Sequence, residues 1–198
     1  MQNTNTSNPK STRLVNLYME ANPNPNSMKF VANFMLLPDG VSLDFPTAEE
    51  ASNSPLAQEL FKLPFVERVF FMSNFVTVTK KDDLDWLEIR DEIKEIIKNY
   101  LEAGNLVVKE LEDNNQINEN DSESVKKIKG ILDEYIRPAV ESDGGAITFH
   151  SFENGVLKVL LQGSCSGCPS STVTLKAGIE NLMKRMLPEV QSVEAQGV

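Results

Sequence analysis

The stretch Val156-Leu-Lys-Val-Leu-Leu-Gln-Gly-Ser-Cys-Ser-Gly-Cys-Pro-Ser-Ser-Thr-Val-Thr-Leu-Lys-Ala-Gly-Ile-Glu180 decides the fold of the second half of this chain. Its first part, 156–162, has the apolar pattern of a strand, and residues 173–186 have a helical pattern. Cys165 and Cys168 are therefore expected in a strand-to-helix turn, where backbone N–H groups and the helix dipole favour thiolate over thiol. Because these are the only two cysteines of the 198 residues, all thiol chemistry of the chain lies at this turn.

A lone C-x-x-C pair is compatible with several kinds of site. One is a thioredoxin-like redox pair, and another is an inert pair in a tight turn. The pair also supplies half of a zinc site or half of an iron–sulfur site, since both normally take four ligands. His150, the single histidine, lies in a predicted strand and is more typical of a surface residue than of a ligand. If a metal or cluster binds, we therefore expect two chains to meet here, each contributing Cys165 and Cys168.

Further motifs surround the cysteine pair. They are Ile131-Leu-Asp-Glu-Tyr-Ile-Arg-Pro-Ala-Val-Glu-Ser-Asp-Gly-Gly145, the segment 152–180 that holds the pair, and Pro188-Glu-Val-Gln-Ser-Val-Glu194. Together they resemble the NifU C-terminal (Nfu) domain over roughly residues 123–196, although Ala146 stands where many members have Asp. The resemblance implies an iron–sulfur scaffold or carrier, not an enzyme. Its 4Fe–4S cluster would bridge two protomers through Cys165 and Cys168.

The upstream half carries a second resemblance. Its motifs are Asn22-Pro-Asn-Pro-Asn-Ser-Met-Lys-Phe30, Ser54-Pro-Leu-Ala-Gln-Glu-Leu-Phe61 and Val69-Phe-Phe-Met-Ser-Asn-Phe-Val-Thr-Val-Thr-Lys80. They look like the N-terminal domain of many Nfu proteins, so the chain resembles a two-domain Nfu protein of bacterial type. The resemblance implies a homodimer on cluster loading, a cluster-donating assembly machinery and recipient apoproteins as partners. The N-terminal half has no cysteine or histidine, and we expect it to recognise those partners.

Composition limits the other functions. The net charge of −10 argues against a nucleic-acid surface, because phosphate binding draws on clustered Lys and Arg. No apolar run approaches the ~20 residues that a membrane helix needs. The polar start, Met1 to Ser11, has no signal-peptide or transit-peptide pattern, and there is no disulfide framework. We therefore expect a cytoplasmic protein that binds neither nucleic acid nor membrane.

The predicted fold class is α+β, with two small domains, each a small β-sheet packed with helices. An acidic flexible linker joins them. The expected boundaries are a disordered tail over 1–15, an N-terminal domain over 16–104, the linker over 105–122 and the cluster-binding domain over 123–198. Residues 105–124 contain six acids and one base, a net charge of −5, and charge repulsion would keep such a segment extended.

Local patterns predict the elements of the N-terminal domain. Strands are expected over 28–35 and 41–45, joined through a turn at Pro38-Asp39-Gly40, and over 66–72 and 75–80, joined at Ser73-Asn74. Helices are expected over 55–62, with Ser54 as N-cap, and over 84–103, ended by Gly104.

In the C-terminal domain, a helix over 124–140 is expected to turn Val125, Ile128, Leu132 and Tyr135 inward and to end at Asp143-Gly144-Gly145. A hairpin over 147–152 and 156–161 turns at Asn154-Gly155, and a last strand covers 190–195. The cysteine turn, defined as residues 163–168, is expected to be exposed, with Gly163 and Gly167 offering backbone N–H groups to a cluster. A thiol–disulfide oxidoreductase and a zinc-bridged structural dimer are the alternative functions of the same cysteine pair.

Overall fold

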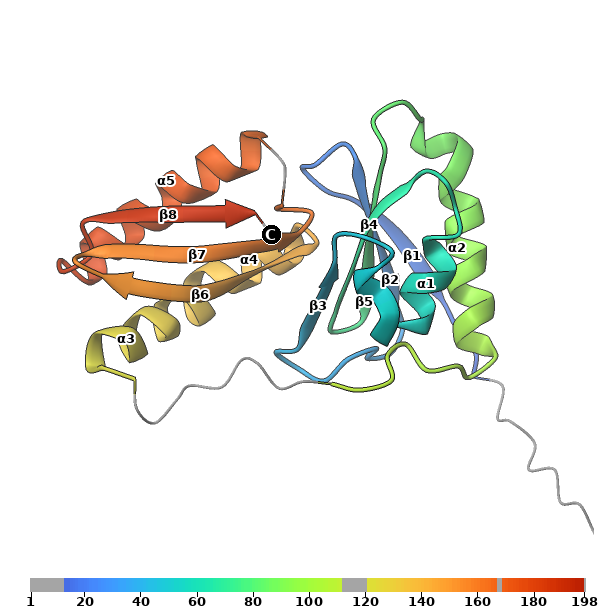
Figure 1. Cartoon of the computed structure of the whole chain (residues 1–198), viewed down its shortest axis with the longest axis horizontal. Coiled ribbons are helices and arrows are strands. Elements are labelled where there is room, and N and C mark those ends of the chain that lie inside the picture. Colours follow the sequence, from blue (N-terminus) through green and yellow to red (C-terminus); the bar gives the residue numbers. More distant parts are fainter. Residues whose placement is uncertain (1–12, 112–120, 167–168, 198) are drawn as a thin grey trace, which may run out of the picture.

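The computed structural model describes residues 13–111, 121–166 and 169–197 of the chain. In these ranges the chain forms two domains that lie side by side, each with a sheet and helices (Figure 1). This confirms the predicted α+β class with two small domains. Residues 112–120 of the predicted linker lie outside the described residues.

The N-terminal domain is built on an antiparallel sheet, which has five strands in the described residues and the order β1-β2-β5-β4-β3. Its strands are β1 (Leu17–Ala21), β2 (Ser27–Ala32), β3 (Ser42–Phe45), β4 (Val66–Met72) and β5 (Phe75–Lys80). The hairpin of β4 and β5 turns at Ser73, as predicted, with Met72 opposite Phe75. The strands expected over 28–35 and 41–45 do not pair with each other across their turn, because β2 pairs with β1 and β5 whereas β3 pairs with β4.

Helices cover one face of this sheet (Figure 1). They are η1 (Glu50–Asn53), α1 (Pro55–Leu60) and α2 (Trp86–Glu102). As predicted, Ser54 caps α1 by accepting a hydrogen bond from the N–H of Ala57, at 3.1 Å. Alternate residues of the strands, such as Phe30, Phe71 and Val76, pack against Ile93 and Ile97 of α2 in one core. This face therefore follows the one-sided burial expected of an antiparallel sheet.

Residues on both sides of the predicted N-terminal domain, 16–104, pack against it or form hydrogen bonds with it. Val15, assigned from the sequence to the tail, is 1% exposed and belongs to the core. Lys109, assigned to the linker, donates its backbone N–H to Asn53 O at 2.9 Å, and Ser54 Oγ donates to Val107 O at 2.8 Å. Residues 105–111 therefore lie against η1 and α1, held by backbone and side-chain hydrogen bonds.

The C-terminal domain has a mixed sheet, with β7 between β6 and β8 in the part of the chain described. The strands are β6 (Gly145–Glu153), β7 (Val156–Gly163) and β8 (Ser192–Gly197). The predicted hairpin of β6 and β7 turns at Asn154 and Gly155, and β8 runs parallel to β7. The helices are α3 (Glu123–Ile131), α4 (Arg137–Ser142) and α5 (Pro169–Met186), with a π-helical turn, η2 (Leu132–Ile136), between α3 and α4.

The π-helical turn changes which face of the helix is buried. In η2 the N–H of Arg137 bonds to Leu132 O, five residues back, so one residue more than in an α-helix fits into the turn. Ile136 consequently packs against the core, and Tyr135 is 49% exposed. The prediction that Tyr135 points inward is wrong for this reason, whereas Ile128 and Leu132 are buried as predicted.

None of the helices in the described residues combines the length and apolar character that crossing a bilayer requires. The two domains have separate hydrophobic cores. A third, smaller cluster lies between them, where Phe70, Met72 and Phe75 of β4 and β5 meet Ala146 of β6. In Figure 1 the ends of β6 and β7 accordingly point at the N-terminal sheet.

Candidate functional site

The cysteine turn follows the last residue of β7. Cys165 comes two residues after Gly163, where β7 ends, and α5 begins at Pro169, so the strand-to-helix placement is as predicted. Cys168 and Gly167 lie outside the described residues. The prediction that the turn is exposed is wrong for Cys165. This residue is 4% exposed and belongs to the core of the C-terminal domain.

Close approach of β6 to the turn buries Cys165. A Cβ atom added to Gly145 would lie 3.0 Å from Cys165 Sγ and 2.6 Å from Gln162 O, which is closer than packed atoms tolerate. Only glycine fits there, at the start of β6, without displacing the turn. Ser164 Oγ donates a hydrogen bond to Asp143 O and lies 3.9 Å from Cys165 Sγ.

The N-terminal domain contributes a second wall to the turn. Thr77 Oγ1 donates to Gly144 O at 2.7 Å, and Asn24 Nδ2 donates to Ser164 O at 3.0 Å. Thr77 is 1% exposed and Asn24 is 7% exposed, so both bonds are shielded from water. These residues hold backbone carbonyl groups of the turn and of the glycine pair before β6.

The N-terminal domain also contacts Gly163, the first residue of the turn. Its φ of +63° is in the left-handed region, and an added Cβ atom would lie 2.8 Å from the ring of Phe70. A side chain is therefore excluded both by the backbone conformation and by the neighbouring domain. The N–H of Gly163 donates to Asp44 Oδ2 at 3.2 Å. In this arrangement it does not offer its N–H to a cluster, contrary to the prediction.

Asp44 is the buried charged group of this contact. Its side chain is 4% exposed and forms a 2.8 Å ion pair with Arg68, so the carboxylate accepts from both Arg68 and Gly163. Burial raises the pKa of Asp44 from 3.8 to about 6, although Arg68 and the N–H of Gly163 both lower the pKa. Desolvation of the charged form outweighs the two favourable contacts.

A raised carboxyl pKa makes the stability of the folded chain depend on pH. Protonation of Asp44 stabilises the folded state fully below the unfolded pKa of 3.8, and this stabilisation is lost as the pH rises through about 6. Between pH 4 and pH 7, we expect the free energy of unfolding of the wild type, measured with urea, to fall by about 2–3 kcal/mol relative to that of Asp44→Asn. Parallel pH curves of the two proteins would contradict this assignment.

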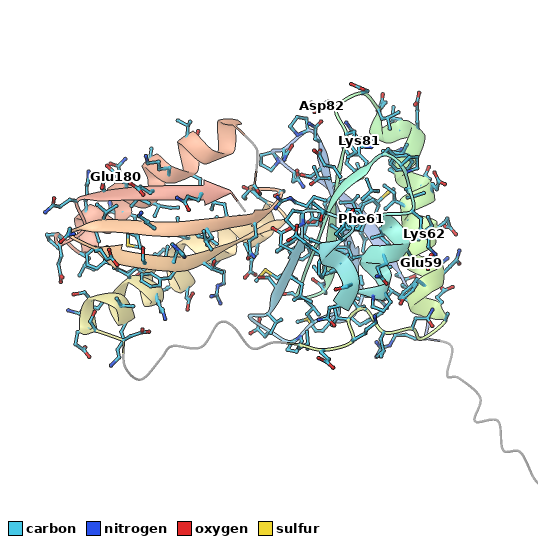
Figure 2. All side chains as sticks on the ribbon, viewed as in Figure 1. Glu59, Phe61, Lys62, Lys81, Asp82 and Glu180 are labelled. Carbon is cyan, nitrogen blue, oxygen red and sulfur yellow. The ribbon has the colours of Figure 1, made fainter. Side chains whose placement is uncertain are left out.

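The described residues do not form a further metal site beside the turn. Within 13–111, 121–166 and 169–197, no three His, Cys, Asp or Glu side chains are grouped so that they could hold a metal ion. His150 is exposed in β6, at the residue where the register of β6 and β7 shifts. Figure 2 shows Glu180 of α5 on the side of the C-terminal domain away from the N-terminal domain. There it accepts from the N–H of Val193, at 3.0 Å.

The residues that sequence reasoning missed all come from the N-terminal domain: Asp44, Phe70 and Thr77 of its sheet, and Asn24 of the turn between β1 and β2. One signal could have indicated them. Residues 69–72 of β4 are consecutively apolar, a pattern typical of strands that are buried on both faces. It predicts a covered second face for this sheet, although it does not say what covers the face.

Comparison with known families matches both halves of the chain. Residues 17–104 match the family described as scaffold protein Nfu/NifU N terminal, and residues 128–194 match the NifU-like domain. A solution NMR structure of a NifU-like protein from Saccharomyces cerevisiae is 28% identical. The alignment of the two structures covers 55% of this chain and 97% of that one, with a TM-score of 0.46.

Curated relatives extend over most of the chain. The NFU1 iron-sulfur cluster scaffold homolog, mitochondrial, of Drosophila persimilis is 44% identical over 87% of this chain and 62% of the relative. The protein of the same name from Drosophila virilis is 42% identical over 93% of this chain and 62% of the relative. The chain thus spans about three fifths of the length of these relatives.

The names of these relatives correct one prediction. They are called mitochondrial, so the predicted cytoplasmic location is wrong. The prediction came from the composition of the chain's first residues and from its few cysteines. Neither feature identifies a cellular compartment, because targeting segments are separate from the domains that fold around a core.

Proposed function

Because the chain belongs to the Nfu/NifU family of iron–sulfur cluster scaffold proteins, we propose that it carries a 4Fe–4S cluster between two protomers and delivers it to apoproteins. The cargo would be held by Cys165 and Cys168 of each protomer. The chain itself would perform no catalysis, and its partners would be a cluster-donating assembly machinery and recipient apoproteins.

One observation carries the proposal: all the thiol groups of the chain lie in one C-x-x-C pair between β7 and α5, inside the match to the NifU-like domain. A cluster of this type takes four thiolates. One chain provides two, so the donor set fits a cluster that two chains share.

The start of the helix that follows the pair favours thiolates. Helix α5 starts at Pro169, directly after Cys168, and the positive end of its dipole faces the turn. This lowers the free energy of negative charge on the sulfurs, and it suits a cargo that is itself anionic when bound by four thiolates. Pro169 needs no hydrogen-bond partner at a helix start, because it has no N–H to satisfy.

Anaerobic reconstitution with iron and sulfide tests the proposal. We expect the loaded protein to show the visible absorption of a 4Fe–4S cluster, four iron atoms per two chains, and twice the mass of the apo chain in analytical ultracentrifugation. Four iron atoms on a monomeric chain would contradict the shared site.

The same experiment separates the alternative functions. A zinc-bridged dimer would contain zinc and show no visible absorption. A thiol–disulfide oxidoreductase would stay a monomer that exchanges between dithiol and disulfide, with no iron bound. Either result would overturn the cluster-carrying function.

A further inference from the structure

The N-terminal sheet has a second face that its own helices leave uncovered. We call it the open face; its residues are Lys29, Ser42, Asp44, Phe70, Met72, Phe75 and Thr77. Phe70, Met72 and Phe75 are at most 3% exposed, although α1 and α2 lie on the opposite side of the sheet. Ala146 and Gly163 of the C-terminal domain cover this apolar part of the open face.

Polar contacts surround the apolar part and reach mainly backbone atoms. The N–H of Gly163 and the carbonyl oxygens of Gly144 and Ser164 bond to Asp44, Thr77 and Asn24, as described above. At the periphery, Lys29 Nζ donates to Ser142 O at 3.4 Å, and Ser42 Oγ donates to Gln162 Oε1 at 3.3 Å. The open face thus fits the main-chain shape of the cysteine turn and of the residues before β6.

This contact is not packed like the inside of a domain. Asn22 Nδ2 and Asp44 Oδ1 are buried there, and among the described residues they have no hydrogen-bond partner. Buried polar atoms without partners weaken an interface by about 1–3 kcal/mol each. Each domain also keeps a complete core of its own when the contact is set aside. The two domains can therefore separate without either of them unfolding.

We propose that the open face of the N-terminal sheet is a binding surface for the chain's own cysteine turn, and that this cover must open before two chains can share a cluster. The second part rests on the proposed function, because it concerns the loading of that site. The first part does not.

Geometry makes the covered state and the shared site exclusive. Two chains that share a cluster must bring their cysteine turns together, with the sulfur atoms reachable from outside each chain. In the covered state the N-terminal domain occupies the backbone edge of the turn at Gly163 and Ser164, and Ser164 is 2% exposed. Cys165 is buried in the core of its own domain beside this edge. A second chain has no access to that edge until the N-terminal domain leaves it.

A double variant of the full chain, Asn24→Asp with Thr77→Val, tests the cover. Asn24→Asp keeps the oxygen that accepts from the N–H of Asn26 at 3.0 Å, but it places an oxygen opposite Ser164 O. Thr77→Val removes the hydroxyl that bonds to Gly144 O and keeps the β-branched shape that suits a strand.

The matched control is Asn33→Asp with Thr79→Val. Asn33 also donates its amide to a backbone carbonyl, that of Leu14 at 3.3 Å, and accepts from the N–H of Asn16 at 3.0 Å. All of these groups belong to the N-terminal domain. Thr79 lies on the same face of β5 as Thr77 and makes no hydrogen bond to the described part of the C-terminal domain.

The first measurement is the hydrogen-exchange rate of the Gly163 amide in the apo chain, followed by NMR spectroscopy, because this N–H donates to Asp44 of the N-terminal domain. Exchange of an amide hydrogen that is bonded across the contact follows the population of the open state. The loss of two hydrogen bonds predicts a rise of roughly tenfold to thirtyfold in the double variant, and no change in the control. The second measurement is the initial rate of cluster loading with both cysteines present, which should rise in the same variant only.

The outcomes separate the two proposals. Equal exchange rates of the Gly163 amide in wild type, double variant and control would overturn the cover. Faster exchange with loading at the wild-type rate would overturn the requirement for opening. Faster exchange with no cluster in any protein would leave the cover standing and refute the carrier function. If circular dichroism shows the double variant unfolded, Ser42→Ala, which removes only the contact to Gln162, gives the same test with a rise of about fivefold.

Discussion

Cys168→Ser is expected to abolish cluster binding and to leave the fold unchanged, whereas Cys165→Ser is expected to abolish binding and also to destabilise the C-terminal domain. Either replacement leaves a shared site with two thiolates in place of four. The expected loss of stability at position 165 comes from burial, because Cys165 packs in the core at 4% exposure. A hydroxyl there loses its hydration, at a cost of about 1–3 kcal/mol.

Iron and sulfide analysis after reconstitution measures the first effect, and urea unfolding of the apo proteins measures the second. Cys165→Ala is the matched control, because it removes the same sulfur without burying a hydroxyl. It should bind no cluster and lose less stability than Cys165→Ser. Normal cluster content in any of these variants would refute the assignment of the ligands.

A fragment of residues 122–198 is expected to fold, to bind the cluster at full stoichiometry and to form the dimer on its own. The core of this domain is built from its own residues, such as Ile128, Leu157, Leu161 and Ile179, and among the described residues it draws no side chain from the N-terminal half. Removing residues 1–121 uncovers Ala146 and the backbone of the cysteine turn, but none of the large core side chains.

Circular dichroism, iron analysis and sizing of the fragment beside the full chain measure this expectation. Transfer assays then test the role of the removed half, and we expect slower delivery to some recipients at unchanged cluster content. A fragment that folds but loads poorly would place part of the cluster site or of its dimer interface in the N-terminal domain. Delivery to every recipient at the full-length rate would contradict partner recognition by residues 13–111.

Much of the fold could be predicted because its signals are local. Ser54 caps α1, Ser73 turns one hairpin and Asn154-Gly155 turns another, each through the conformation of a few adjacent residues. Such preferences act within one turn of chain and do not need the rest of the molecule. The one local failure has a local cause, since η2 takes in an extra residue and turns Tyr135 out of the core.

Strand order was not predictable in the same way. The turn signal at Pro38-Asp39-Gly40 is genuine, with Gly40 at φ +76°, yet the strands on its two sides do not pair. β5 separates β2 from β4, and β3 adds to the far edge. A turn fixes the direction of the chain over four residues, whereas pairing is decided by which strands bury the most apolar surface together.

The sequence by itself determined the chemistry of this protein: two thiols in one turn, at the start of a helix, in a chain with no other cysteine and with His150 as its single histidine. These are properties of spacing and residue type, which no fold can change. The tertiary structure alone decided that Cys165 is buried and that Asn24, Asp44 and Thr77 reach the turn from more than sixty residues away. Contacts between residues so distant in sequence form only when two folded domains pack together. They depend on the complementary shapes of the two surfaces, which no short stretch of sequence defines.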